Sequence, residues 1–194
     1  MGADSERTKQ VILRAARDVI AESGYPAATF QQIALRAGIS RPTLHYYFEA
    51  RDQIYETLVA AVNTQIAGFI AEARRHVGPR SQLVAFTQAV ERVCDEDPGA
   101  LRFLVTVQVE QRRGVHSSST AGAVIAALHD FYASLADAAP VDDRRGLTEL
   151  LASVFWGVAF HAGFVACSGE ASIVARQLHT VFDDELLTSQ NKAS

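Results

Sequence analysis

Cysteine is scarce in this chain of 194 residues, which contains two, Cys94 and Cys167, far apart in the sequence. There is no CxxC pair and no cluster of cysteine with histidine, so the sequence predicts neither a disulfide framework nor a thiolate metal site. The histidines also lack the HxxxH spacing that places two imidazoles on one helix face. We therefore expect no metal and no cofactor, and the cytoplasm as the compartment.

An excess of positive charge is also missing. The formal net charge is −4 and the isoelectric point is about 5.8. Residues 1–58 contain seven basic and seven acidic side chains, so the negative excess lies entirely in residues 59–194. This excludes a protein that binds nucleic acid through bulk positive charge. It leaves room for a sequence reader with a few well-placed basic groups near the N-terminus.

Motifs of catalysis are absent as well. The sequence has no GxSxG, no HExxH and no glycine-rich phosphate loop. Glu91, Asp95 and Glu110 are acidic, but nothing in the pattern pairs them for acid–base work. We predict that the chain is not an enzyme, and an enzyme on a helical scaffold stays as a remote alternative.

One long apolar run, from Leu150 to Cys167, approaches the length of a membrane span. It has His161 near its centre, and basic residues flank it closely on one side only, at Arg144 and Arg145. We therefore predict a helix that is buried on all sides in a protein core, with no membrane contact. The polar N-terminus shows no signal peptide.

Hydrophobic residues recur at helical spacing along the chain, which predicts an all-α fold of about nine helices. The first should run from about Ser5 to Glu22, before Gly24 and Pro26. Residues 99–113 also alternate like a strand, but no second strand is available for pairing, so we expect a helix there. Further helices are expected around residues 54–77, 83–97, 124–135, 142–167 and 174–182.

Residues 29–48, TFQQIALRAGISRPTLHYYF, have the pattern of two short helices joined by a tight turn. Thr29 and Gln32 have capping-box spacing, and Ser40 suits the N-cap of the second helix, with Pro42 in its first turn. Gly38 suits the turn because it has no Cβ. The inward positions are Ile33, Ala34, Ala37, Ile39 and Leu44. This pattern predicts a helix-turn-helix, whose second helix enters the major groove of DNA.

Outward side chains of the second helix have the chemistry of base recognition. Arg41 can address guanine through two hydrogen bonds, and Thr43 and His45 can address several base edges. Other side chains can reach phosphates and fix the register on the duplex. These are Thr43, Tyr46, Tyr47 and Arg51.

The stretch from Thr8 to Ile54 resembles the TetR family of bacterial repressors. The matching pieces are Ile12-x-x-Ala15-Ala16, Gly24-Tyr25, Thr29, Ile33-Ala34-x-x-Ala37-Gly38-Ile39-Ser40 and Thr43-Leu44-x-Tyr46-Tyr47-Phe48. They cover about a quarter of the chain. Their combined spacing is far more specific than a generic helix-turn-helix pattern.

This resemblance implies an all-helical homodimer that binds double-stranded operator DNA through its first three helices, with the fourth linking them to the body. Carried over by position, the side chains facing bases would be Gln31, Arg41, Pro42 and His45. Those facing the DNA backbone would be Thr29, Thr43, Tyr46, Tyr47 and Arg51. The chain departs from the family at His45, where tyrosine is usual, and at Arg51, where lysine is usual, which changes the hydrogen-bond geometry available there.

In the rest of the chain, aromatic side chains recur with a few polar residues among them. A buried polar group needs a partner, and an apolar pocket with a few convergent polar groups is a common ligand site. We therefore expect a small, apolar effector in the body, although each of these residues could instead belong to the core. The expected lining residues are Phe103, Gln108, Tyr132, Trp156, Phe160 and His161.

We expect residues 1–50 to form the helix-turn-helix domain and residues 51–194 the effector-binding and dimerisation domain. The dimer would use the last two helices, where small residues allow close packing. These small residues are Gly157, Ala162, Gly163 and Ala166. The predicted function is a ligand-responsive repressor of a palindromic operator. A regulator controlled by a protein partner, or one without an effector, would have the same DNA reader and stays open.

Overall fold

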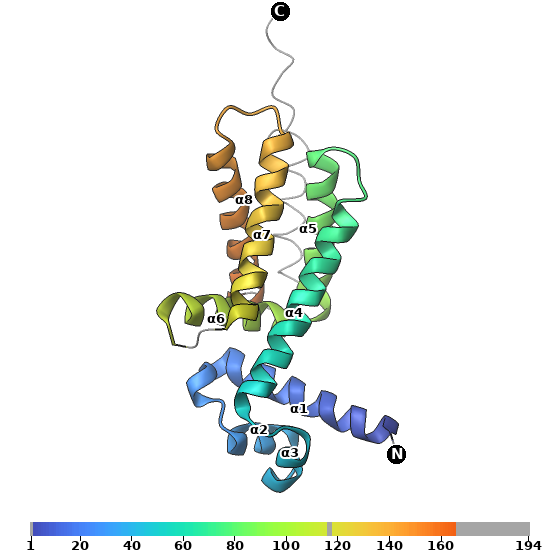
Figure 1. Cartoon of the computed structure of the whole chain (residues 1–194), viewed down its shortest axis with the longest axis vertical. Helices are drawn as coiled ribbons and strands as arrows, with labels where there is room; N and C mark the ends of the chain where they lie inside the picture. The colour runs from blue at the N-terminus through green and yellow to red at the C-terminus, as the bar shows by residue number, and fades with distance from the viewer. Residues whose placement is uncertain (1, 116–117, 166–194) are drawn as a thin grey trace, which may run out of the picture.

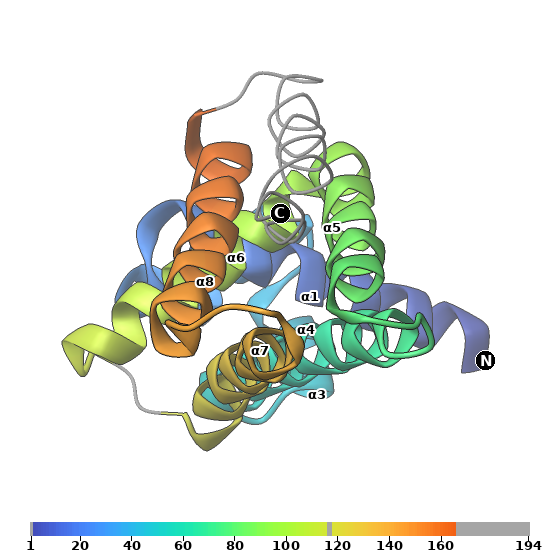
Figure 2. The same cartoon turned by 90° about the horizontal axis from the view of Figure 1, so that it is seen from above.

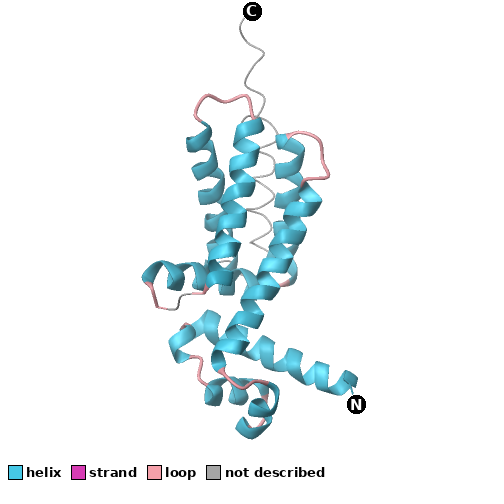
Figure 3. Cartoon of the chain, viewed as in Figure 1, coloured by secondary structure: helices cyan, strands magenta, loops and turns pink. Residues whose placement is uncertain are grey.

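The computed structural model of the chain describes residues 2–115 and 118–165 (Figure 1). All regular structure in this part is helical, without a strand, which confirms the all-α prediction (Figure 3). The α-helices are α1 (Gly2–Ser23), α2 (Phe30–Ala37), α3 (Arg41–Tyr47), α4 (Arg51–Ala73), α5 (Pro79–Glu96), α6 (Pro98–Arg113), α7 (Ser119–Ala138) and α8 (Arg144–Phe160). A short 3-10 helix, η1 (Tyr25–Ala27), follows α1, and a π-helical turn, η2 (His161–Val165), continues α8. The helix expected around residues 174–182 lies outside the described residues.

Helices α1, α2 and α3 form a small unit at one end of the molecule (Figure 1). Its core consists of side chains that recur at helical spacing and are almost fully buried, among them Ile12, Ala16, Ile20, Ile33 and Leu44. Burial of the leucine and isoleucine side chains contributes about 1.5–3 kcal/mol each and holds the three helices together.

The long helix α4 begins beside this unit and continues into the body, where it stands with α5, α7 and α8 (Figures 1 and 2). Helix α6 crosses the base of the body, between it and the small unit, and contacts α1. A cluster of aromatic rings fills the body core, with ring centroids 5.0–6.4 Å apart. Its members are Phe86, Phe131, Tyr132 and Phe155.

The apolar helix expected at residues 142–167 is present from Arg144, but the prediction that it is buried on all sides is wrong. Leu150 and Phe160 are 45% and 51% exposed on one side of α8. Two described helical segments, Arg51–Ala73 and Arg144–Val165, are long and apolar enough to cross a membrane by length and composition alone. Core helices of soluble proteins pass the same test, so this is weak support for a span.

Two of the small residues assigned to the dimer contact have a different role. A Cβ at Gly163 would lie 2.7 Å from the Cα of Arg102, so Gly163 allows η2 to pack directly on α6 within one chain. Ala162 is also buried within the chain. Gly157 has open space around it, and Ala166 lies outside the described residues.

Candidate DNA interface

Helices α2 and α3 begin and end as their sequence predicts. The hydroxyl of Thr29 accepts a hydrogen bond from the backbone N–H of Gln32 at 3.2 Å, and that of Ser40 accepts one from Thr43 at 3.1 Å. Each satisfies a backbone donor that the first helical turn leaves free. Gly38 ends α2 at φ +68°, in the left-handed region that glycine adopts without steric penalty. The residues at 29–48 therefore form two helices joined by a tight turn.

Helix α3 is anchored through a single fully buried side chain, that of Leu44. Most of its other side chains are exposed, and Tyr46 reaches 82%. The side chain of His45 remains exposed while its ring packs edge-on against Phe30 of α2, with the centroids 4.4 Å apart. The residues of the predicted interface that are exposed together on α2 and α3 are Thr29, Gln31, Arg41, Pro42, Thr43, His45 and Tyr46.

Because Ser40 caps α3, its replacement by alanine should lower the stability of the small unit. We expect Ser40→Ala to reduce the free energy of unfolding by about 1 kcal/mol, measured by thermal or denaturant unfolding. Thr64→Ala is a suitable control, since Thr64 lies inside α4 and its hydroxyl only bonds back to the carbonyl of Ala60. Equal stability of Ser40→Ala and the unmodified chain would show that this cap is not needed.

Arg51 is placed differently from the other predicted contacts. Its guanidinium lies 4.1 Å from the centre of the Tyr25 ring and donates to the carbonyl oxygens of Tyr25 and Pro26 at 3.3 Å. Tyr47 is only half-buried, with its ring edge-on to Tyr46. Tyr47 thus lies beside the exposed residues of α2 and α3 that form the predicted interface, whereas Arg51 binds the turn after α1. The one sequence signal for the contact between Arg51 and Tyr25 is arginine at a position where lysine is usual. A guanidinium stacks on aromatic rings better than an ammonium group does.

Two further contacts hold the small unit together. Arg36 of α2 donates to both carboxylate oxygens of Glu22 in α1, at 3.0 and 2.5 Å, and these bonds lower the pKa of Glu22. The hydroxyl of Tyr25 bonds to Asp52 at the start of α4. Burial, together with this carboxylate, raises the pKa of Tyr25. Both contacts orient helices and were not predicted from the sequence.

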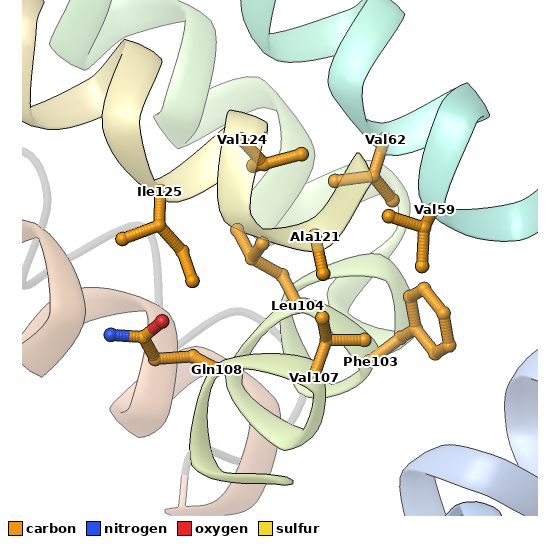
Figure 4. A pocket seen from close by; sticks show the side chains of 9 residues that line it. All are labelled: Val59, Val62, Phe103, Leu104, Val107, Gln108, Ala121, Val124 and Ile125. Carbon is orange, nitrogen blue, oxygen red and sulfur yellow. The ribbon is translucent and has the colours of Figure 1, made fainter. Parts of the chain in front are cut away.

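The body contains a small cavity between α4, α6 and α7 (Figure 4). Its volume is about 10 Å³, which is room for about one water molecule. Of the six predicted effector residues, Phe103 and Gln108 line it. Its other lining residues are Val59, Val62, Leu104, Val107, Ala121, Val124 and Ile125, which sequence reasoning did not single out.

The remaining four predicted effector residues lie elsewhere. Tyr132 belongs to the aromatic core, and half-buried Trp156 packs edge-on against Phe155. Phe160 is exposed and stacks on Phe164 at 5.2 Å. His161 is half-buried in η2, and its Nδ1 atom has no hydrogen-bond partner among the described residues. The structure therefore does not gather the six residues into one site.

An exposed helix of this kind, set on a capped helix and a tight turn at the end of an all-helical body, defines a helix-turn-helix protein. Residues 12–58 match the family model described as bacterial regulatory proteins of the tetR family. This match covers about a quarter of the chain and confirms the resemblance of residues 8–54 to the TetR family.

Individual proteins are also similar to this chain. The chain is 30% identical over 100 residues to the transcriptional activator FasR of Mycolicibacterium smegmatis, a match that covers 51% of this chain and 45% of FasR. The match therefore spans less than half the length of that curated relative. A TetR-like regulator from Rhodococcus sp. RHA1 superposes with a TM-score of 0.71 over 90% of this chain and 93% of its own, at 19% identity. FadR of Bacillus subtilis, solved in complex with stearoyl-CoA, superposes with a TM-score of 0.60 over 91% of this chain and 98% of its own, at 14% identity.

Proposed function

We propose that this chain is a cytoplasmic transcriptional repressor that binds a palindromic DNA operator as a homodimer and responds to a small apolar effector. Residues 1–50 would read the DNA, and residues 51–194 would bind the effector and form the dimer. The observation that carries the proposal is the exposed, outward-facing surface of α3. A helix held mainly by Leu44 and by Phe48 at its end can enter the major groove without exposing the core of its own domain.

The contacts of this surface divide by chemistry into two groups. Side chains for bases would be Gln31, Arg41, Pro42 and His45. Those for the DNA backbone would be Thr29, Thr43, Tyr46 and Tyr47. Arg51 would contribute by fixing the turn at Tyr25, or by reaching a phosphate if it leaves that ring.

The dimer would use α8 and the helix expected after it. The apolar side chains exposed on α8 and η2 are of the kind that subunit contacts bury. These are Leu150, Phe160, Phe164 and Val165. A symmetric pair would hold the two α3 helices about 34–36 Å apart, one turn of DNA, or at a multiple of that distance.

The effector would bind at the cavity bounded by Phe103 and Gln108. In the present conformation this cavity holds no more than about one water, so an effector must push α4, α6 and α7 apart. A ligand that prefers the opened body lowers the operator affinity by its differential binding free energy. Control by a protein partner, or a regulator without an effector, would leave this cavity closed and stays as the alternative.

Selection of DNA by the full chain from a random duplex pool tests the proposal. We expect enrichment of a palindrome with two half-sites, and a mass in solution of twice 21.0 kDa. A reporter placed behind the selected site should be repressed, whereas increased expression would indicate activation, the role named for FasR. Failure to enrich any sequence would contradict the proposal.

A further inference from the structure

Glu110 is a carboxylate buried between the body and the helix-turn-helix domain. It lies on α6 and is 7% exposed. Its Oε1 atom accepts a hydrogen bond from the backbone N–H of Tyr25 at 2.8 Å. A charged side chain is rarely buried without a specific partner, because desolvation is costly. The partner here belongs to the other domain, 85 residues earlier in the chain.

The fit around this contact is close. Gly24 has φ +79°, a backbone conformation that favours glycine, and a Cβ there would lie 2.7 Å from the Oε1 atom of Glu110, so the carboxylate would have to move. The Oε2 atom of Glu110 is buried and has no hydrogen-bond partner among the described residues. The carboxylate therefore makes one directional bond, to the first residue of η1.

Tyr25, which receives this bond, is itself clamped on both sides. Its ring packs edge-on against Tyr55 of α4, with centroids 4.8 Å apart, and lies 4.1 Å from the Arg51 guanidinium. Tyr55 in turn packs against Phe103, a wall of the body cavity, at 6.2 Å. Tyr25 thus connects the turn between α1 and α2 with α4, through Arg51 and Tyr55, and with α6, through Glu110.

Besides the contacts of Tyr25 with α4, a further side-chain link joins the reader to the base of the body. Arg17 of α1 donates to Asp97, between α5 and α6, at 2.5 Å. Arg51, Asp52 and Tyr55 link Tyr25 only to α4, the helix that also connects the domains covalently. The bonds of Glu110 and Asp97 link the reader to α6 and to the residue before it, so they limit a swing of the reader about α4. Loss of the Glu110 bond would therefore widen the range of angles between the reader and the body, while the two domains stay attached.

We propose that Glu110 is a positioning residue that holds the DNA reader at a fixed angle to the body and so sets the half-site spacing that the protein accepts. This inference rests on the proposed function. Val107 and Gln108, on the same helix, line the cavity, so any ligand that displaces α6 also moves Glu110. A backbone N–H held by a carboxylate is a strong, directional contact suited to this task.

The test measures the affinity of full-length Glu110→Leu for operators whose half-sites are separated by one or two inserted or deleted base pairs. The unmodified chain should lose affinity steeply as the spacing departs from that of the selected operator. Glu110→Leu should flatten this profile, with at least a tenfold smaller difference between the selected and altered spacings, while binding to a single half-site is unchanged. A merely structural role would weaken binding to every duplex alike.

Two variants serve as controls. Glu110→Gln keeps an acceptor oxygen for Tyr25 and should retain the steep profile. Glu72→Leu makes the same change as Glu110→Leu at an exposed position of α4, where Glu72 forms an ion pair with Arg75, and should behave as the unmodified chain. A Glu110→Leu profile as steep as that of the unmodified chain, or a Glu110→Gln profile as flat as that of Glu110→Leu, would overturn the proposal.

Amide hydrogen exchange in the DNA-free protein provides a second measurement that needs no operator. The Tyr25 amide should exchange about tenfold faster or more in Glu110→Leu, because its acceptor is gone. An unchanged rate would also overturn the inference. If the unmodified chain selects no DNA although Tyr25 exchange responds as expected, the proposed function fails and the domain contact stands.

Discussion

Replacement of Arg41 by alanine should lower the affinity for the selected operator by about a hundredfold or more, while binding to random duplex DNA changes little. Arg41 is exposed at the first turn of α3, where a guanidinium can address guanine with two hydrogen bonds. Each such contact contributes about 1–3 kcal/mol of discrimination, and a dimer would lose two of them. Competition binding with the operator and a scrambled duplex measures the effect.

Arg74→Ala is the matched control for this experiment. Arg74 is also an exposed arginine, but it caps α4 at the opposite end from the reader, so the same change in charge should leave operator affinity intact. If Arg41→Ala lowers the affinity for operator and random DNA equally, Arg41 contacts phosphate, and the prediction that it contacts a base would be wrong.

Phe103→Ala should lower the free energy of unfolding by about 3–5 kcal/mol, a large share of the about 5–15 kcal/mol that stabilises a typical domain. Phe103 is 1% exposed and packs between Tyr55 and the cavity, so removal of its ring leaves a void inside the body. The void would join the present cavity of about 10 Å³. Denaturant unfolding measures the loss.

The enlarged cavity gives the same variant a second readout. A buried apolar void left by a phenyl ring can bind a ligand of similar size. Toluene should therefore raise the melting temperature of Phe103→Ala and not that of the unmodified chain. Phe103→Leu keeps most of the volume and should show a smaller loss of stability with little response to toluene. No response in Phe103→Ala would indicate that the neighbouring helices collapse into the space, and that the proposed effector site cannot be opened there.

The DNA reader could be predicted from the sequence because its signals are local. Thr29, Gly38 and Ser40 determine where α2 and α3 begin and end through bonds that span no more than five residues. Alternation of buried and exposed positions then decides which side chains of α3 face outward. The role of Arg51 could not be obtained in this way, because its partner Tyr25 precedes it by 26 residues and is reached only after folding.

The effector site was predicted less well for a related reason. Composition indicated that aromatic and polar side chains share the body, but not which helices face each other. Phe103 and Gln108 line one cavity because α6 crosses α4 and α7, whereas Phe160 lies on the free side of α8. The long apolar run likewise indicated burial of residues 150–167, and only the packing of α8 shows that one side of it is left uncovered.

The attachment of α3 mainly through Leu44 and Phe48 has a consequence for how such a protein can change over generations. Substitutions at Arg41, Thr43 or Tyr46 alter exposed side chains outside the core, so we expect folding to tolerate them. New operators can then be acquired by drift at these few positions, without any matching adjustment in the body. Duplicate copies of the gene could therefore diverge in the promoters they control while keeping the same response to the same molecule.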